Sequence, residues 1–309
     1  MIPTYPWASD KQPGSTNEAT VSRRSAIAIG SVTALQVSFT PSALAKGDTT
    51  KLPPMGFIDS STGMADDPAA FALARRAGLD GVEISTMRPA DTLSFATKQQ
   101  REIYSRAIET HGVVVCSTCP LLMLHHPLQS DPRGEAWLRQ SVETAAFFDA
   151  DAVLVPFFAK GDLIVNEELH EPSVAATVKK LQAVAPMAAD RGVTLGIENT
   201  LSAAQNLQIL ERVGHDSVRI YYDIANSSKR GYDVPAEIRR LKDLVCRFHL
   251  KDNAGRFPTG QPEIDPIIEA IQSIGYDDWI VLERNFEPET PAAYFRHNAR
   301  YVRDRWKSR

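Results

Sequence analysis

Short apolar runs alternate with longer amphipathic segments along the chain from about residue 53 onward. The runs are rich in Val, Ile and Leu, and the longer segments repeat apolar residues every three or four positions, which predicts alternating strands and helices. The predicted strands cover 55–59, 81–85, 113–116, 152–156, 193–198, 218–223, 244–249 and 279–283. The predicted helices cover 71–77, 99–110, 135–148, 174–191, 203–213, 236–242, 264–274 and 291–306.

Eight strand–helix units predict an α/β protein with a single (β/α)₈ TIM barrel over residues 46–309, because about 250 residues are typical of that fold. The apolar strands are those of a parallel sheet that is buried on both faces. An open, doubly wound sheet is the alternative. It would normally carry a glycine-rich phosphate loop after its first strand, and Asp59-Ser-Ser-Thr-Gly63 is not such a loop.

Residues 1–45 have the order of a cleavable signal peptide. Arg23 and Arg24 precede a weakly apolar stretch over 26–39, and the small-x-small sequence Ala43-Leu44-Ala45 follows it. Paired arginines with mild hydrophobicity favour the twin-arginine export machinery. The stretch is too short and too polar for stable membrane insertion. We therefore predict a periplasmic or secreted protein, and a disordered N-terminal extension is the alternative.

The net charge of −4 gives no general electrostatic reason to expect binding to nucleic acid or to an anionic membrane. Cys116 and Cys119 form a C-x-x-C, but the motif ends a strand pattern and has no second copy, so we interpret it as structural. A periplasmic location would permit a disulfide, and pairing stays open. A homodimer also stays open, because the sequence does not reveal the oligomeric state.

Four successive predicted strands end in a side chain that can bind a metal ion: Glu198, Asp223, His249 and Glu283. All strands of a barrel end at one face, where active sites lie. Burying a charged residue there is costly, and a divalent cation would offset the cost. Three carboxylates and one imidazole suit a single Mn²⁺, Mg²⁺ or Co²⁺ ion better than a metal that prefers thiolates.

These positions and the segment His249-Leu-Lys-Asp-Asn253 resemble the xylose-isomerase-like barrel superfamily, over most of residues 53–305. That group includes sugar phosphate isomerases, ketose 3-epimerases, hydroxypyruvate isomerase and inosose dehydratase. The resemblance implies that Glu198, Asp223, His249 and Glu283 bind one divalent metal. By similarity to the ketose epimerases, it also implies that Glu198 and Glu283 move the proton from opposite faces of the substrate.

The chemistry of such a reaction agrees with these residue types. A metal ion stabilises the enediolate that forms when a proton next to a carbonyl is removed. One carboxylate acts as the base, and a second returns the proton. Lys251 lies on the same side of the strand as His249, where it could stabilise the enediolate or bind a substrate oxygen. A salt bridge to Glu283 or Asp223 is the alternative. We predict a metal-dependent isomerase or epimerase that acts on a keto-sugar or related polyol.

The chain departs from the ketose epimerase pattern at two positions that hold substrate in that family. Asn226 stands where those enzymes have a His, and Gly255, followed by Arg256, stands where they have an Arg. These differences argue against an ordinary ketohexose as the substrate. Further candidates for substrate contact are Glu83, His125, Asn226 and Arg256.

Three other functions are considered. A lyase or dehydratase acting on a keto-sugar, inosose or keto-glycoside would begin with the same proton abstraction. A non-catalytic periplasmic sugar-binding protein would not need four metal ligands. A DNA-repair endonuclease of this superfamily needs several zinc ions and more His ligands, and the acidic balance and seven His residues argue against it.

Overall fold

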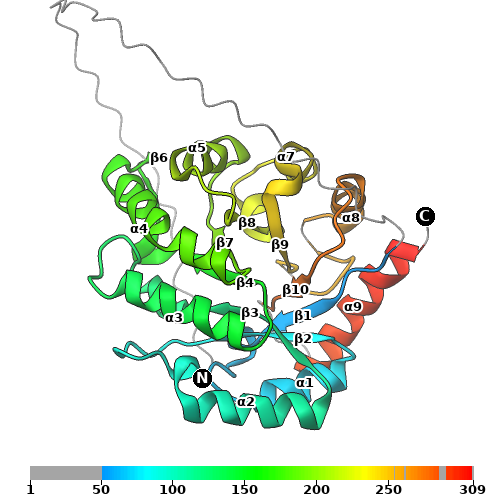
Figure 1. The fold of residues 1–309 in the computed structure, drawn as a ribbon. Helices are drawn as coiled ribbons and strands as arrows, with labels where there is room; N and C mark the ends of the chain where they lie inside the picture. The colour runs from blue at the N-terminus through cyan, green and yellow to red at the C-terminus, as the bar shows by residue number, and fades with distance from the viewer. Residues whose placement is uncertain (1–50, 254, 261, 285–289, 308–309) are drawn as a thin grey trace, which may run out of the picture. The chain divides into compact units, whose positions relative to one another are not determined.

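The computed structural model describes residues 51–253, 255–260, 262–284 and 290–307, and eight parallel strands of this part form one closed barrel (Figure 1). Around the barrel the strands follow the order β1-β10-β9-β8-β7-β4-β3-β2. Their bounds are β1 (Met55–Ile58), β2 (Gly81–Ser85), β3 (Val114–Cys119), β4 (Ala152–Pro156), β7 (Thr194–Glu198), β8 (Val218–Asp223), β9 (Val245–Leu250) and β10 (Ile280–Leu282). The first and last strands close the barrel, because Met55 pairs with Ile280. The prediction of a (β/α)₈ barrel is confirmed.

Helices surround these strands (Figure 1). They are α1 (Ala69–Ala77), α2 (Lys98–His111), α3 (Gly134–Phe147), α4 (Glu171–Asp190), α5 (Ala203–Val213), α6 (Ile224–Lys229), α7 (Val234–Leu241), α8 (Ile264–Ser273) and α9 (Pro291–Lys307). Buried apolar side chains fill the layer between the strands and the helices, as where Phe57 packs on Phe295 with ring centroids 4.8 Å apart. Helices α1 and α5 end at Gly78 and Gly214, whose φ angles of 72° and 65° are left-handed and therefore favour glycine.

The structure adds elements that the hydrophobic pattern does not predict. A two-stranded antiparallel hairpin, β5 (Ile164–Val165) and β6 (Glu168–Leu169), lies in the connection after β4. The six-residue helix α6 directly follows β8. Strand β3 also runs three residues beyond its predicted end, to Cys119. The additions lie in the connections or lengthen a strand, so they leave the order of the predicted strands unchanged.

A β-bulge between β8 and β9 sets which side chains face the barrel interior. Ile220 pairs with Val245, whereas the next residue, Tyr221, pairs with Arg247, so Cys246 is the extra residue. One extra residue shifts the alternation of side chains. Val245 can therefore pack in the outer core while His249 faces the interior. A second irregularity of this kind lies between β2 and β3.

The predicted signal segment, 1–45, lies outside the described residues. Among the helices that the structure describes, none combines the length and the apolar character of a membrane span. Cys116, Cys119 and Cys246 are all buried and free, so the C-x-x-C forms no disulfide here.

Candidate metal centre

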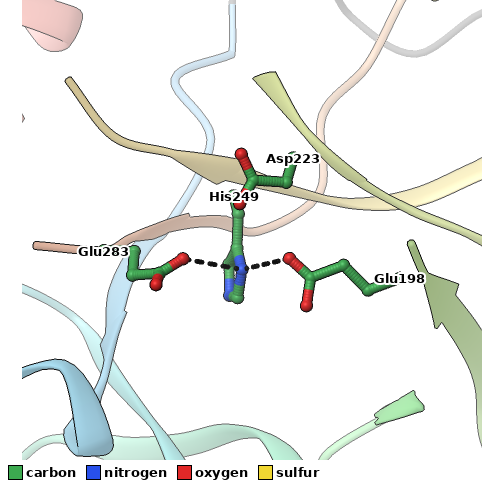
Figure 2. A group of neighbouring side chains, drawn as sticks. All are labelled: Glu198, Asp223, His249 and Glu283. Atoms are coloured by element: carbon green, nitrogen blue, oxygen red, sulfur yellow. Dashed lines mark hydrogen bonds and ion pairs between the residues drawn. The ribbon is translucent and has the colours of Figure 1, made fainter. Parts of the chain in front are cut away.

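Four side chains from four neighbouring strands converge at the carboxyl end of the barrel (Figure 2). They are Glu198, Asp223, His249 and Glu283, and one ligand atom from each lies within 4.8 Å of the others. Ligands on opposite sides of a Mg²⁺-like ion are about 4.2 Å apart, given metal–oxygen distances of about 2.1 Å. The spacing in the structure is therefore close to what one divalent ion requires.

The register of the strands produces this convergence. Glu198 and Asp223 are the last residues of β7 and β8, and Glu283 directly follows β10. Asp223 pairs with His249 across β8 and β9, so their side chains stand at the same height in the barrel. Parallel strands thus bring residues far apart in the sequence to one level, as the sequence predicts.

Asp223 has a structural role in addition to its place in the cluster. Its Oδ1 accepts hydrogen bonds from the backbone N–H groups of Ala225 and Asn226, at 2.8 and 2.9 Å, and so caps the first turn of α6. Its Oδ2 points the other way, 2.7 Å from the Nζ of Lys251. Burial opposes the ionisation of Asp223, but the positive charges of Lys251 and His249 outweigh burial and hold its pKa below the usual value.

Lys251 is almost fully buried between two acids. Its Nζ lies 2.7 Å from Asp223 Oδ2 and 2.8 Å from Glu283 Oε2. Burial opposes the charge of the ammonium group, but Asp223 and Glu283 outweigh burial and raise the pKa of Lys251. The salt bridges considered from the sequence are therefore both present, and they place a positive charge next to the cluster.

His249 lies at the centre of the cluster. Its Nδ1 is 3.0 Å from Glu198 Oε1 and 3.5 Å from Glu283 Oε2, and its Nε2 is 3.2 Å from Glu83 Oε1. Burial disfavours the charged imidazole, but the carboxylates of Glu198 and Glu83 outweigh burial and raise the pKa of His249 well above its usual value. Burial also raises the pKa of Glu198 to about 7, although His249 counteracts it.

The charge balance of the cluster fits a cation. Glu83, Glu198, Asp223 and Glu283 bring four carboxyl groups together, against the ammonium of Lys251 and the imidazole of His249. Oxygen ligands with one imidazole nitrogen are typical of Mg²⁺, Mn²⁺ and related divalent ions. The residues present therefore fit one such ion, which Glu198, Asp223, His249 and Glu283 could hold.

The other candidate residues lie in different surroundings. Glu83 has no exposed surface, and its two oxygens contact His249 and the hydroxyl of Tyr221. Asn226 is buried in α6, where its backbone N–H bonds Asp223. His125 and Arg256 are exposed, and neither belongs to the converging group.

A family model for xylose isomerase-like TIM barrels matches residues 71–305. The chain belongs to this family. Among curated proteins, it is similar to a ketose 3-epimerase of Arthrobacter globiformis, with 24% identity over 226 residues that cover 68% of this chain and 74% of that protein. It is also 27% identical, over 198 residues, to a putative L-ribulose-5-phosphate 3-epimerase of Escherichia coli (strain K12), with 60% of this chain and 68% of that protein covered.

Solved structures share the fold. A xylose isomerase-like TIM barrel protein from Mycobacterium smegmatis in complex with magnesium superimposes with a TM-score of 0.68 and 14% identity, over 84% of this chain and 98% of that chain. At these identities the likeness establishes the fold alone. The curated relatives are sugar epimerases, and this agrees with a sugar isomerase or epimerase in general terms.

Proposed function

We propose that this protein is a metal-dependent isomerase or epimerase of a keto-sugar or related polyol. The observation that carries the proposal is the convergence of Glu198, Asp223, His249 and Glu283 within 4.8 Å at the end of the barrel where active sites lie. The sugar epimerases among its relatives support the same reaction class. A divalent ion held by the four residues would supply Lewis-acid polarisation of the substrate's carbonyl and hydroxyl oxygens.

In the proposed reaction, Glu198 and Glu283 move the proton. Glu198 and Glu283 approach His249 from opposite sides (Figure 2). One carboxylate removes the proton from the carbon beside the carbonyl, and the other delivers a proton to the opposite face. The ammonium of Lys251, 2.8 Å from Glu283, supplies positive charge where the substrate oxygen becomes negative. Asp223, which also caps α6, acts as a metal ligand and takes no part in proton transfer.

The test begins with metal analysis of the purified protein and continues with a panel of keto-sugars in D₂O. An epimerase gives an isomer of unchanged composition, with deuterium incorporated next to the carbonyl. Loss of water or of an aglycone would assign a lyase or dehydratase instead. A protein that binds sugar without any deuterium exchange would be a binding protein, and the enzymatic proposal would be wrong.

Glu283→Gln separates proton transfer from metal binding. The amide keeps an oxygen ligand and nearly the same shape but removes the basic carboxylate. General acid–base catalysis typically contributes about 10²–10⁴-fold, so turnover should fall by that order while the variant folds and retains at least part of its metal. Asp223→Asn is the comparison, and it should lose metal and activity together. Near-normal turnover of metal-loaded Glu283→Gln would exclude the two-glutamate mechanism.

We also propose that residues 1–45 direct twin-arginine export, on the evidence of Arg23-Arg24 and the Ala43-Leu44-Ala45 pattern. Export of a folded enzyme favours an unphosphorylated substrate outside the cytoplasm. Replacing both arginines with lysine should leave the precursor in the cytoplasm, and the exported wild type should begin near Lys46. Export that does not respond to this change would contradict the twin-arginine route.

A further inference from the structure

Glu83 is a buried carboxylate that the proposed reaction does not use. It lies on β2 inside the barrel with no exposed surface. Burying an ionised carboxylate is costly unless hydrogen bonds compensate for the lost water. Its Oε2 accepts hydrogen bonds from the hydroxyl of Tyr221, at 2.7 Å, and from the hydroxyl of Ser117. These contacts come from β8 and β3, and β8 stands four places from β2 around the barrel. Glu83 is therefore fixed from both sides of the barrel interior.

The other oxygen of Glu83 meets the imidazole of His249. Oε1 lies 3.2 Å from Nε2, and both side chains are almost fully buried. Tyr221 contacts the same ring edge-on, with ring centroids 4.6 Å apart and an interplanar angle of 63°. The opposite nitrogen, Nδ1, faces Glu198 and Glu283. One edge of the ring thus meets Glu83 and the other meets the converging acids.

We propose that Glu83 is a positioning residue that orients His249 for metal binding. A metal ion binds the neutral ring, and when Glu83 accepts the Nε2–H of that ring, the lone pair is on Nδ1, the nitrogen that faces Glu198 and Glu283. Histidines that bind metals usually donate their other N–H to such a partner, which fixes the tautomer and the orientation of the ring. This inference rests on the proposed metal site, and it gives a reason for a carboxylate deep inside the barrel.

Glu83→Gln reverses the polarity of this contact with little change of shape. Two hydroxyl groups donate to Oε2, so the amide oxygen should take that position and turn the NH₂ group toward His249. An amide N–H directed at Nε2 favours the tautomer that carries its proton on Nδ1. In that tautomer Nδ1 carries a proton, so it has no lone pair to offer a metal ion held by the other three candidate ligands.

Glu237→Gln is a matched control. Glu237 accepts a hydrogen bond from the hydroxyl of Tyr222 at 2.9 Å, as Glu83 does from the adjacent Tyr221, but this bond joins β8 to α7 and lies outside the group of four candidate ligands. A loss of stability caused by replacing the charged acceptor of a tyrosine hydroxyl with a neutral amide should appear in both variants. An effect on the metal site should appear only in Glu83→Gln.

The experiment titrates the purified protein with Mn²⁺ and follows free Mn²⁺ by electron paramagnetic resonance. Pulsed measurements on the bound ion report its coupling to imidazole nitrogen. We expect Glu83→Gln to bind Mn²⁺ about 10–100-fold more weakly than wild type, with an altered nitrogen coupling. Glu237→Gln should bind within about twofold of wild type and keep the coupling.

Equal Mn²⁺ affinity and coupling in Glu83→Gln and wild type would overturn the inference. Equal losses of Mn²⁺ affinity in Glu83→Gln and Glu237→Gln would also overturn it, since they would indicate a general structural effect.

If Glu83→Gln does not fold, the Tyr221→Phe variant tests the inference, because it removes only one of the two hydrogen-bond donors to Glu83 Oε2. It should weaken Mn²⁺ binding in the same direction by a smaller factor, and an unchanged affinity would reject the inference. A wild-type protein that binds no Mn²⁺ would instead contradict the proposed metal site itself.

Discussion

Arg247 and His249 lie two residues apart on β9, yet the acids around them differ in their contact with water. Arg247 is buried near the amino end of the barrel and forms ion pairs with Asp151, which precedes β4, and with Asp278, which precedes β10. The side chains of those two aspartates are 58% and 41% exposed. At the carboxyl end, by contrast, the acids around His249 and Lys251 have at most 13% of their side chains exposed.

The difference shows what distinguishes a structural ion cluster from one that can bind a ligand. Water can solvate the partly exposed carboxylates of Asp151 and Asp278, so no bound ion is needed to compensate for their charge. Water cannot solvate the acids at the carboxyl end to the same extent, and four carboxyl groups gather there around Lys251 and His249. Under the proposed function, a bound cation would offset part of the cost of burying these acids.

Lys251→Met tests this comparison with the largest expected effect. Without the ammonium group, Asp223 and Glu283 are buried with less compensation, so the metal-free protein should lose about 3–5 kcal/mol of unfolding free energy. Mn²⁺ should bind about tenfold or more tightly, because a nearby positive charge is gone. Denaturant unfolding with and without Mn²⁺ measures both effects. The same loss of stability in the presence and absence of saturating Mn²⁺ would contradict the comparison.

Arg247→Met is the corresponding change at the amino end. We expect a loss of about 0.5–3 kcal/mol of unfolding free energy, within the range of most single substitutions, since its partners can turn to water. The affinity for Mn²⁺ should stay within about twofold of wild type. A large change in Mn²⁺ affinity would mean that the two ends of the barrel interior are coupled.

Asp278→Asn should have the smallest effect. The carboxylate is partly exposed and Arg247 keeps its second partner, Asp151, so the unfolding free energy should change by no more than about 1 kcal/mol. Thermal unfolding compared with that of wild type measures the change. A loss as large as that of Lys251→Met would indicate that burial does not distinguish the two clusters.

The sequence predicts the barrel and the four converging residues for one reason. Apolar strands followed by polar residues recur in order, and parallel strands must end together. Predicting that Glu198 and Asp223 lie together therefore requires only that their strands are assigned correctly. The sequence pattern does not predict α6, because this helix has six residues without an amphipathic repeat and its cap is the side chain of Asp223.

The contacts of Glu83 could not be predicted from the sequence. His249 is 166 residues away, and Tyr221 is 138 residues away. Which residues meet inside the barrel depends on the bulge at Cys246, because the bulge sets the direction of every later side chain of β9. The sequence therefore identifies Glu83 only as a candidate for substrate contact, and the structure adds its neighbours: a histidine, a tyrosine and a serine.

The contact of Glu83 with His249 also limits which fragments of the barrel could carry the complete site, and whether the site could be grafted onto another protein. Three of the converging residues belong to β7, β8 and β9 and the fourth, Glu283, directly follows β10, whereas Glu83 belongs to β2. A fragment or a graft that contained only the second half of the barrel would carry every candidate ligand. It would lack the carboxylate that orients the imidazole. The complete centre is therefore a property of the closed barrel, and it forms only when both halves of the chain have come together.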